Sequence, residues 1–376
     1  MNFFVLEYIQ GVIMMKILAA FDSFKESMTA YAAGEAVQRA YNNVHICPLA
    51  DGGEGTMEVM NRYLHGDIHE IEVAGPLFKT VHAKLAIMDD LAIIESAQAC
   101  GLDYLTEEEK NGTEATSYGV GEMMKYAYDH GVKRFLLTLG GSACNDGGIG
   151  LLSGMGYGFF DQFDQRIPMN ARGLETLDHI KKTRLDLSSI EVEGACDVTN
   201  PLCGKEGATY VFGPQKKVKD LEKTDQAMKH YAKIMSELVD KDDSCLPGAG
   251  AAGGMGYSIV TGLNGKLVTG FDAVSRTVHL EEAIQEADII FTGEGKMDHQ
   301  TLYGKTPIGV LRLAQKYNKP VVAFCGKCED KETLLEAGFE DVRCINHTDE
   351  PLSVLLEKGP QYLEEEVRRY LEEKNV

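Results

Sequence analysis

The stretch Lys16-Ile-Leu-Ala-Ala-Phe21, followed directly by Asp22-Ser-Phe-Lys25, decides the fold class of this chain. Its apolar run is short and typical of a buried strand. Alanines and a valine at helical spacing follow over Thr29–Tyr41, with Thr29 as a suitable N-cap. His45–Ala50 then predicts another short strand, and a further helical stretch comes after it. This alternation of short apolar runs with amphipathic segments predicts an α/β protein.

The same alternation returns near the C-terminus. Strands are expected at Asp288–Thr292, Pro320–Phe324 and Val342–Ile345, and helices at Pro307–Tyr317, Lys331–Gly338 and Leu352–Leu371. Because both chain ends carry this pattern, we expect them to build one parallel-sheet domain of three layers, Rossmann-like and of the flavodoxin type.

The middle of the chain has a different character. Closely spaced β-rich runs at 71–73, 81–88 and 92–94 leave little room for helices and therefore favour antiparallel pairing, and a helix is expected near Val218–Val239. We predict a discontinuous parallel-sheet domain over 15–70 and 281–376, with a mixed α/β domain inserted over 71–280.

The apolar stretch from Phe3 to Phe21 raises the question of a membrane segment. Glu7, Gln10 and Lys16 interrupt it, no basic segment precedes it, and no small-residue cleavage pattern follows. We therefore expect neither a signal peptide nor a membrane span. Residues 1–14 are expected to be an N-terminal extension outside the fold.

Composition narrows the class of function. The chain has 376 residues, enough for two or three domains at roughly 150 residues each. Hydrophobic residues make up 44% and charged residues 25%, an ordinary globular composition. The formal net charge of −21 disfavours nucleic acid and anionic membranes as partners, so a small anionic substrate would need a local basic pocket. Glycine is enriched, with 40 residues in clusters.

Nine cysteines without regular spacing predict reduced thiols and a cytoplasmic protein. The one CxxC, Cys325 to Cys328, follows an apolar run and could open a helix as a redox pair does. A redox role predicts a reversible Cys325–Cys328 disulfide. It is disfavoured because no second CxxC accompanies it, and a zinc site lacks its second pair of ligands.

A glycine-rich loop, Gly140-Gly-Ser-Ala-Cys-Asn-Asp-Gly-Gly148, follows the apolar run Arg134–Leu139. Glycines let backbone amides approach an anion closely, and a helix beginning at Gly147 would add positive potential. A plain glycine-lined turn is the alternative, but its concentration of polar residues favours ligand binding by Gly141, Ser142, Asn145 and Asp146.

A literal G-x-G-x-x-G occurs at Gly248, Gly250 and Gly253. The polar segment Lys241–Cys245 precedes it where a dinucleotide fingerprint requires a strand, so NAD binding is not expected. Phosphate contact and close backbone packing both remain open for these glycines.

Charged residues cluster again after the strand expected at Asp288. Thr292-Gly-Glu-Gly-Lys296 is followed by Asp298, Thr301 and Gly304-Lys-Thr306, but His299 stands where a P-loop needs its leading glycine. Because α/β sheets bind ligands beyond the carboxyl ends of their strands, these charges favour a site over a solvated loop.

Further polar residues follow other expected strands: Asp22, Ser23 and Lys25 after the first, Asp51 and Glu54 after the second, and Asp197, Asn200 and Lys216 in the middle segment. One strand-end aspartate is often only a helix cap. This whole set suits phosphoryl transfer, which needs acids for Mg²⁺ and for a hydroxyl proton, lysines for phosphate charge, and backbone amides for oxygens.

These strings together resemble the type-1 glycerate kinases. They are Asp22–Lys25, Pro48–Gly55, Gly140–Ser142 with Asn145–Gly148, Cys196–Val198 with Asn200–Leu202, Gly213–Lys216, Pro247–Gly254, and Thr292–Gly295 with 298–301. The resemblance runs from about Met15 to the C-terminus. It implies a two-domain α/β kinase, monomer or homodimer, that transfers the γ-phosphoryl group of ATP to D-glycerate with Mg²⁺. The implied product is 2-phosphoglycerate, with 3-phosphoglycerate as the alternative.

Three positions depart from the family's pattern. Glu26 stands where glycine is usual, Cys144 replaces a usual threonine, and Lys296 stands where arginine is common. None of these changes removes a charged group on which the expected chemistry depends, although lysine lacks the bidentate fork of arginine.

We expect substrate and nucleotide to meet in a cleft between the two lobes. The candidate catalytic residues are Lys25, Asp197 and Asp298. Lys25 is expected to stabilise the transferred phosphate or the glycerate carboxylate, and Asp197 to act as base or Mg²⁺ ligand. Glu294 and Asp298 are candidates for binding Mg²⁺ or for accepting the proton. The other candidate binding residues are Asp22, Ser23, Asp51, Glu54, Gly141, Ser142, Asn145, Asp146, Asn200, Lys216, Gly250, Gly253, Lys296, Thr301 and Lys305.

Two other functions compete with this interpretation. One is a kinase for another small hydroxy acid, such as tartronate or a sugar acid. The other is a non-catalytic regulator that binds a metabolite, which would show ligand-dependent thermal stabilisation without turnover.

Overall fold

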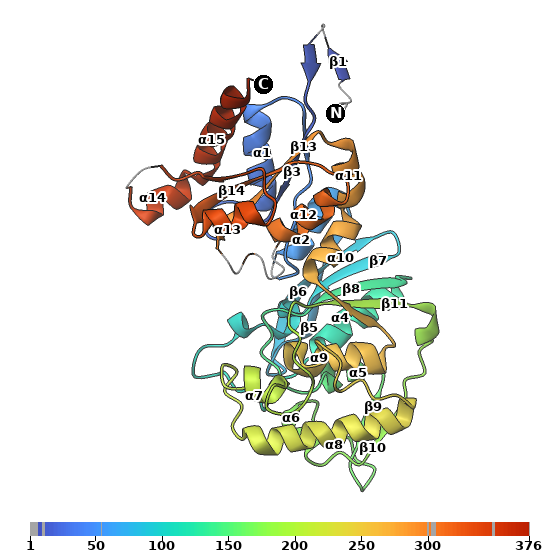
Figure 1. The fold of residues 1–376 in the computed structure, drawn as a ribbon. Helices are drawn as coiled ribbons and strands as arrows, with labels where there is room; N and C mark the ends of the chain where they lie inside the picture. The colour runs from blue at the N-terminus through green and yellow to red at the C-terminus, as the bar shows by residue number, and fades with distance from the viewer. Residues whose placement is uncertain are drawn as a thin grey trace. The chain divides into compact units, whose positions relative to one another are not determined.

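The computed structural model describes residues 7–9, 12–53, 55–298, 301, 306–347 and 350–375. Its contacts divide the chain into two compact units, each with its own sheet (Figure 1). Unit 1 comprises Met1–Asp51, Glu58–Leu64 and Val274–Val376, and unit 2 comprises Gly52–Met57 and His65–Ala273. The domain limits expected near residues 70 and 280 stay a prediction.

Unit 1 is built on a five-stranded, wholly parallel sheet in the order β15-β14-β13-β3-β4. The strands are β3 (Ile17–Phe21), β4 (Val44–Ile46), β13 (Ile289–Met297), β14 (Val321–Cys328) and β15 (Asp341–Cys344). Both chain ends contribute to it, which confirms the predicted parallel α/β fold. Every residue of β3 is buried, as its apolar sequence predicts.

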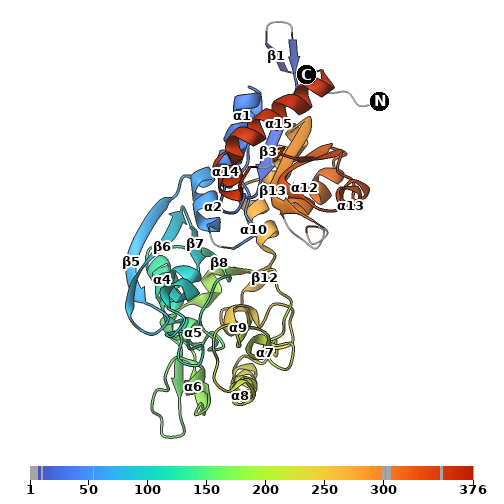
Figure 2. The same cartoon turned by 90° about the vertical axis from the view of Figure 1, so that its left-hand side faces the viewer.

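Helices cover both faces of this sheet, which gives three layers (Figure 2). Helices α1 and α15 lie side by side on one face, where Val37, Phe291 and Tyr370 belong to one buried cluster, and α12 lies on the other face. The helices of unit 1 are α1 (Ala30–Ala40), α11 (Leu280–Glu286), α12 (Thr306–Gln315), α13 (Lys331–Glu336), α14 (Leu352–Glu357) and α15 (Gly359–Lys374). Helix α1 begins after Thr29, whose hydroxyl accepts the amide of Ala32 at 3.1 Å.

Two expected elements differ in the structure. The single helix expected over Leu352–Leu371 is wrong, because α14 ends at Glu357 and a separate helix, α15, begins at Gly359-Pro360. Proline favours the first helical turn, and a Cβ at Gly359 would lie 2.1 Å from Ser27 Oγ. The strand expected over His45–Ala50 ends at Ile46 as β4.

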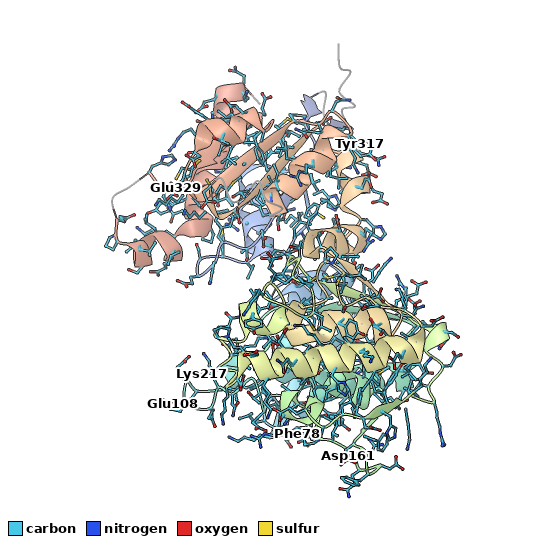
Figure 3. All side chains as sticks on the ribbon, turned by 60° about the horizontal axis from the view of Figure 1, so that its bottom comes forward. Phe78, Glu108, Asp161, Lys217, Tyr317 and Glu329 are labelled. Atoms are coloured by element: carbon cyan, nitrogen blue, oxygen red, sulfur yellow. The ribbon has the colours of Figure 1, made fainter. Side chains whose placement is uncertain are left out.

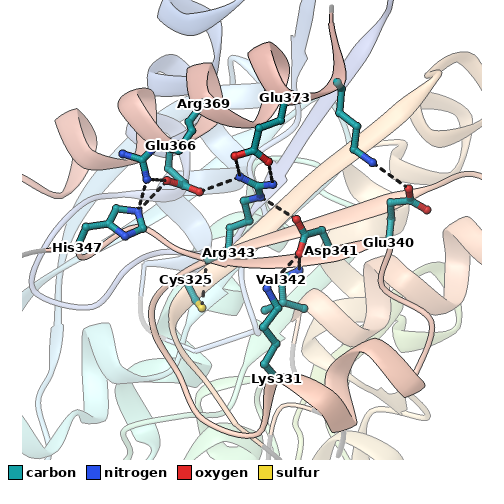
Figure 4. A network of polar contacts seen from close by, with 11 residues as sticks. Cys325, Lys331, Glu340, Asp341, Val342, Arg343, His347, Glu366, Arg369 and Glu373 are labelled. Carbon is teal, nitrogen blue, oxygen red and sulfur yellow. Dashed lines mark hydrogen bonds and ion pairs between the residues drawn. The ribbon is translucent and has the colours of Figure 1, made fainter.

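Ion pairs fasten α15 to β15 (Figure 4). Arg343 binds Asp341 at 2.7 Å, Glu366 at 3.2 Å, and Glu373. Glu366 is buried and also contacts His347 at 2.7 Å and Arg369 at 2.6 Å. A buried carboxylate is tolerated here because two guanidinium groups, those of Arg343 and Arg369, pair with it.

Unit 2 contains a six-stranded mixed sheet in the order β12-β11-β8-β7-β6-β5. Neighbours from β12 to β7 pair in parallel, and the pairs β7–β6 and β6–β5 are antiparallel, as predicted for these closely spaced runs. The strands are β5 (Asp67–Ala74), β6 (Thr80–Met88), β7 (Leu91–Glu95), β8 (Arg134–Thr138), β11 (Glu191–Ala195) and β12 (Lys266–Val268).

The remaining elements of unit 2 pack around one large core that includes Phe135, Phe159 and Tyr231. They are α3 (Ala97–Cys100), η1 (Leu102–Tyr104), α4 (Tyr118–Asp129), α5 (Ile149–Gly154), β9 (Gly158–Phe160), α6 (Ala171–Leu174), β10 (His179–Lys181), η2 (Leu187–Ser189), α7 (Ala208–Phe212), α8 (Leu221–Val239), α9 (Ala251–Tyr257) and η3 (Ser258–Gly262). Helix α8 forms where it was expected and is capped by Asp220, which accepts the amide of Lys223 at 3.0 Å.

The chain passes from one unit to the other within two helices, α2 (Thr56–Leu64) and α10 (Gly270–Thr277). Before the first sheet, β1 (Glu7–Ile9) and β2 (Val12–Met14) form a small antiparallel hairpin. The extension expected over 1–14 stays a prediction, since 1–6, 10 and 11 lie outside the described residues. Within the described ranges, no helix has the length and apolar character needed to cross a membrane.

Gly293 in β13 has no room for a side chain, because a Cβ there would lie 1.8 Å from the carbonyl oxygen of Phe324. We expect Gly293→Ala to lower the free energy of unfolding by about 3 kcal/mol, measured by urea denaturation. Gly295→Ala is the matched control in the same strand, because its Cβ would come no closer than 3.4 Å to a neighbouring atom, an ordinary contact. Equal stability losses in the two variants would contradict this account.

Candidate active site

Acidic side chains gather at one edge of the unit 1 sheet. Asp22 follows β3 directly, Asp51 comes after β4, and Glu294 lies in β13 beyond its pairing with β3. In a parallel sheet the carboxyl ends of neighbouring strands meet at the same edge, which is where α/β proteins bind ligands. Asp51 and Glu294 both lie close enough to Asp22 to raise its pKa.

Asp22 is a strongly perturbed carboxyl of this edge. Burial raises its pKa to about 7, and the charges of Asp51 and Glu294 act in the same direction. The Thr306 hydroxyl donates to Oδ2 at 2.6 Å and the Ser23 amide donates to Oδ1 at 2.7 Å, which offsets part of that rise. The carboxyl can therefore exchange a proton near neutral pH, as a general base must. The sequence analysis had assigned Asp22 to the binding residues and not to the catalytic ones.

A buried threonine sets the geometry of the next two acids. The Thr301 hydroxyl donates to Glu294 Oε1 at 2.8 Å and accepts the amide of Asp298 at 3.1 Å. The Thr301 amide in turn donates to the carbonyl of Asp298 at 2.9 Å. Thr301 is thus an orienting residue for Glu294 and Asp298, both of which the sequence had selected.

The lysines of this edge differ in their surroundings. Lys296 lies 3.1 Å from Asp298 and 3.0 Å from Glu329, which Figure 3 labels, and both carboxylates raise its pKa, Glu329 most. Its charge is therefore already paired. Lys25 is exposed in the turn after β3 and has no hydrogen bond or ion pair with any described residue. Lys305 and Glu54 lie outside the described residues.

Unit 2 presents a second such edge, at the carboxyl ends of β7, β8, β11 and β12. Asp197, after β11, is exposed, and its Oδ1 accepts the amide of Gly270 at 3.0 Å. Glu95, the last residue of β7, is 2% exposed and accepts the amide of Met57 at 2.9 Å, at the start of α2. The sequence analysis did not select Glu95. The available signal was an acidic residue at the end of an apolar strand.

The Gly140 loop shows only its first two residues to solvent. Gly140 and Gly141 are exposed, whereas 142–148 are buried. Asn145 donates to Thr209 Oγ1 at 2.9 Å, and Asp146 accepts from the amide and hydroxyl of Ser117 at 2.8 and 2.9 Å. Burial raises the pKa of Asp146. Both side chains are therefore engaged inside the protein, although Oδ1 of Asn145 has no partner among the described residues, and ligand binding by them stays a prediction.

The helix expected from Gly147 begins only at Ile149, as the short α5. Behind Gly147, the Gly248 loop approaches the Gly140 loop through its backbone. A Cβ at Gly253, where φ is +69°, would lie 2.2 Å from the carbonyl oxygen of Cys144, and the Gly147 amide donates to the Gly253 carbonyl at 2.9 Å. A Cβ at Gly250 would lie 2.3 Å from the carbonyl of Pro201. Close packing thus accounts for these glycines, and phosphate contact by them stays a prediction.

Asn200 supports the same region through its side chain. Its Nδ2 donates to the Glu206 carbonyl at 2.7 Å, while its backbone carbonyl accepts the amide of Gly250 at 2.9 Å.

The CxxC pair does not have the setting of a redox motif. Cys325 and Cys328 both lie within β14 and do not open a helix, and all nine cysteines are free. Burial raises the pKa of the Cys325 thiol, which disfavours redox reactivity.

A carboxylate of unit 1 fits the role of a Mg²⁺ ligand in a site that the substrate phosphates complete. No group of three or more His, Cys, Asp or Glu side chains among the described residues forms a ready metal centre. Mg²⁺ is usually bound by only one or two carboxylates, with substrate phosphates and water completing its shell. Glu294, oriented by Thr301, can supply such a carboxylate.

The family model described as "Glycerate kinase family" matches residues 17–373 of this chain. The chain belongs to the glycerate kinase family. It is 40% identical over 362 residues to a glycerate kinase of Haemophilus influenzae, covering 93% of this chain and 96% of that protein. It is 38% identical over 328 residues to an Escherichia coli protein named glycerate 2-kinase, covering 84% and 86%. The expected family and class of enzyme are confirmed.

The fold agrees with a solved structure as well. The crystal structure of a protein assigned as glycerate kinase 2 from Salmonella typhimurium LT2 matches with a TM-score of 0.88 at 37% identity, covering 96% of this chain and 98% of that chain.

One departure from the family's pattern has a visible effect on the backbone. Glu26 adopts φ +64°, a left-handed conformation in which glycine is favoured.

The Asp22 carboxyl should make stability depend on pH. It keeps its proton up to about pH 7 in the folded protein but only to about 3.8 when exposed, so this contribution is complete below about pH 4 and is lost as pH rises through 7. We expect the melting temperature to fall between pH 4.5 and 8.5 less steeply in Asp22→Asn than in the wild type. The measurement is a series of thermal melts.

Asp90→Asn is the matched control for that series. Arg134 lowers the pKa of Asp90, so this carboxylate is already ionised over the whole range and its loss should leave the slope unchanged. If Asp22→Asn and the wild type show parallel pH profiles, the buried-carboxyl account of Asp22 is wrong.

Proposed function

We propose that this protein transfers the γ-phosphoryl group of ATP to the 2-hydroxyl of D-glycerate with Mg²⁺, and so forms 2-phosphoglycerate. Membership of the glycerate kinase family supports the substrate, and the relative named glycerate 2-kinase supports the position. The observation that carries the proposal is the carboxyl of Asp22 at the acidic edge of the unit 1 sheet, where Thr306 and the Ser23 amide hold its two oxygens and burial raises its pKa to about 7.

Asp22 is the proton acceptor in this proposal, a role for which the sequence had named Asp197, Glu294 and Asp298. When the substrate oxygen attacks the γ-phosphorus, its hydroxyl must lose a proton, and a base with a pKa near the working pH takes it most efficiently. Thr306 holds Oδ2 and the Ser23 amide holds Oδ1, so the orientation of the carboxyl is fixed before substrate binds.

Two further residues of unit 1 complete the proposed chemistry. Glu294, held by Thr301, is the proposed ligand for Mg²⁺, which neutralises phosphate charge when bound. Lys25 is the proposed partner of the transferred phosphate, since its ammonium is exposed and unpaired among the described residues. Lys296 fixes Asp298 through their ion pair, so we assign Asp298 an orienting role.

In unit 2 the proposed phosphate contacts are the backbone amides of Gly140 and Gly141, the exposed part of the loop after β8. Asp197 stays a candidate for the base or for a Mg²⁺ ligand, since its carboxylate is exposed at the edge of the same sheet. A cytoplasmic location and a monomeric or homodimeric state stay predictions.

Phosphorus NMR of the reaction products tests the activity and the position together. We expect D-glycerate and Mg·ATP to give 2-phosphoglycerate and ADP, and chelation of Mg²⁺ to stop the reaction. Parallel rates with tartronate and a sugar acid should be lower. Faster turnover of either acid would replace the proposed substrate, and 3-phosphoglycerate as the product would overturn the proposed position. Binding without any turnover would favour a regulator.

Substitution separates the candidate bases. We expect Asp22→Asn to lower kcat by about 100-fold or more at saturating substrates, the usual cost of losing a general base. Asp90→Asn, the same change at a surface ion pair, should leave kcat unchanged. Asp197→Asn is measured beside them. A large loss there with a near-normal Asp22→Asn would transfer the role of base to Asp197.

A further inference from the structure

Lys216 is a buried cation that the proposed chemistry leaves without a role. It lies in the turn between α7 and α8, and only 3% of it is exposed. Its ammonium donates to Ser142 Oγ at 3.0 Å and to the carbonyl oxygen of Cys144 at 2.7 Å. It forms no ion pair with any carboxylate in the described part of the chain, so its charge is held by two neutral oxygens.

Such an arrangement costs the fold free energy. Removing an ammonium from water is unfavourable, and burial lowers the pKa of Lys216 accordingly. The charge of Asp146 acts in the opposite direction, although the two side chains form no ion pair. An apolar side chain of similar length would avoid this cost. The charge at this position is therefore better explained by what it holds in place than by a gain in stability.

Both oxygens that Lys216 holds belong to the Gly140 loop. Strand β8 fixes the loop at its start, and the Gly253 carbonyl fixes it at Gly147. Between these points, Ser142 pairs with Gly101 in an isolated bridge, and the Ala143 amide donates to the Cys100 carbonyl at 2.7 Å. Lys216 adds a side-chain anchor at Ser142 and Cys144, in the segment that follows the exposed Gly140 and Gly141.

We propose that Lys216 is a positioning residue, whose ammonium holds Ser142 and Cys144 so that the amides of Gly140 and Gly141 keep the direction needed to bind phosphate. This inference rests on the proposed function of that loop. It replaces the sequence-based expectation that Lys216 itself binds substrate or nucleotide.

Lys216→Met tests it, because methionine keeps the length of the side chain and removes its donors. We expect kcat to fall about 10- to 100-fold with little change in KM, since misplaced donors weaken transition-state binding most. The melting temperature should stay the same or rise, because a buried charge is lost. Hydrogen exchange at the amides of Ala143 and Gly147 should become about tenfold faster.

Tyr157→Phe is the matched control. It removes another buried hydrogen bond of unit 2, from the tyrosine hydroxyl to the Gly262 carbonyl at 2.7 Å, and neither partner belongs to residues 140–148. Its melting temperature should fall while kcat, KM and exchange at Ala143 remain those of the wild type. A purely structural Lys216 would behave like this control.

Several results would overturn the inference. Wild-type kcat with normal loop protection in Lys216→Met would remove any positioning role, and a raised KM with unchanged kcat would show direct ligand contact. If Lys216→Met does not fold, Ser142→Ala removes one of the two acceptors and must show the same faster exchange and lower kcat. Exchange needs no substrate, so a wild type without kinase activity would refute the proposed function while the loop anchor is still measured.

Discussion

The parallel pairing of β3 with β13 is the constraint on which the acidic edge depends. It joins Ile17–Phe21 to Ile289–Gly293, residues more than 270 positions apart, and the Asp22 amide extends it by donating to the Gly293 carbonyl at 3.0 Å. This register brings Asp22, after the end of β3, close to Glu294 in β13, and the charge of Glu294 opposes ionisation of Asp22. Without the close approach that Gly293 allows between β13 and β14, the pairing that sets this geometry would be strained.

Unit 2 uses a different means to hold its loop. Two polar groups that the sequence places in a ligand site are buried: Asn145 donates through Nδ2 to Thr209, and Asp146 accepts from Ser117, while Oδ1 of Asn145 has no partner among the described residues. A polar network behind a glycine turn limits the directions that the backbone amides of the turn can take. The exposed part of the loop is the backbone of Gly140 and Gly141, which have no side chains.

Much of this was predictable from the sequence, because strands and their following acids are local patterns. The parallel sheet, the antiparallel runs, the Thr29 cap and the family all follow from short strings. The state of each side chain does not, because it depends on partners that are distant in sequence. Thr306 reaches Asp22 across 284 positions, and Lys216 reaches Ser142 across 74. The break before α15 was readable from Gly359-Pro360, whereas the burial of Ser142 and Lys216 was not.

The distribution of thiols has a practical consequence. Of the nine free cysteines, eight are buried or partly covered, and Cys245 in unit 2 alone is exposed. Maleimide reagents react with accessible thiols, so a fluorophore can be attached at this single native position without first rewriting the sequence. The wild-type chain thus carries its own attachment point for optical experiments on ligand binding.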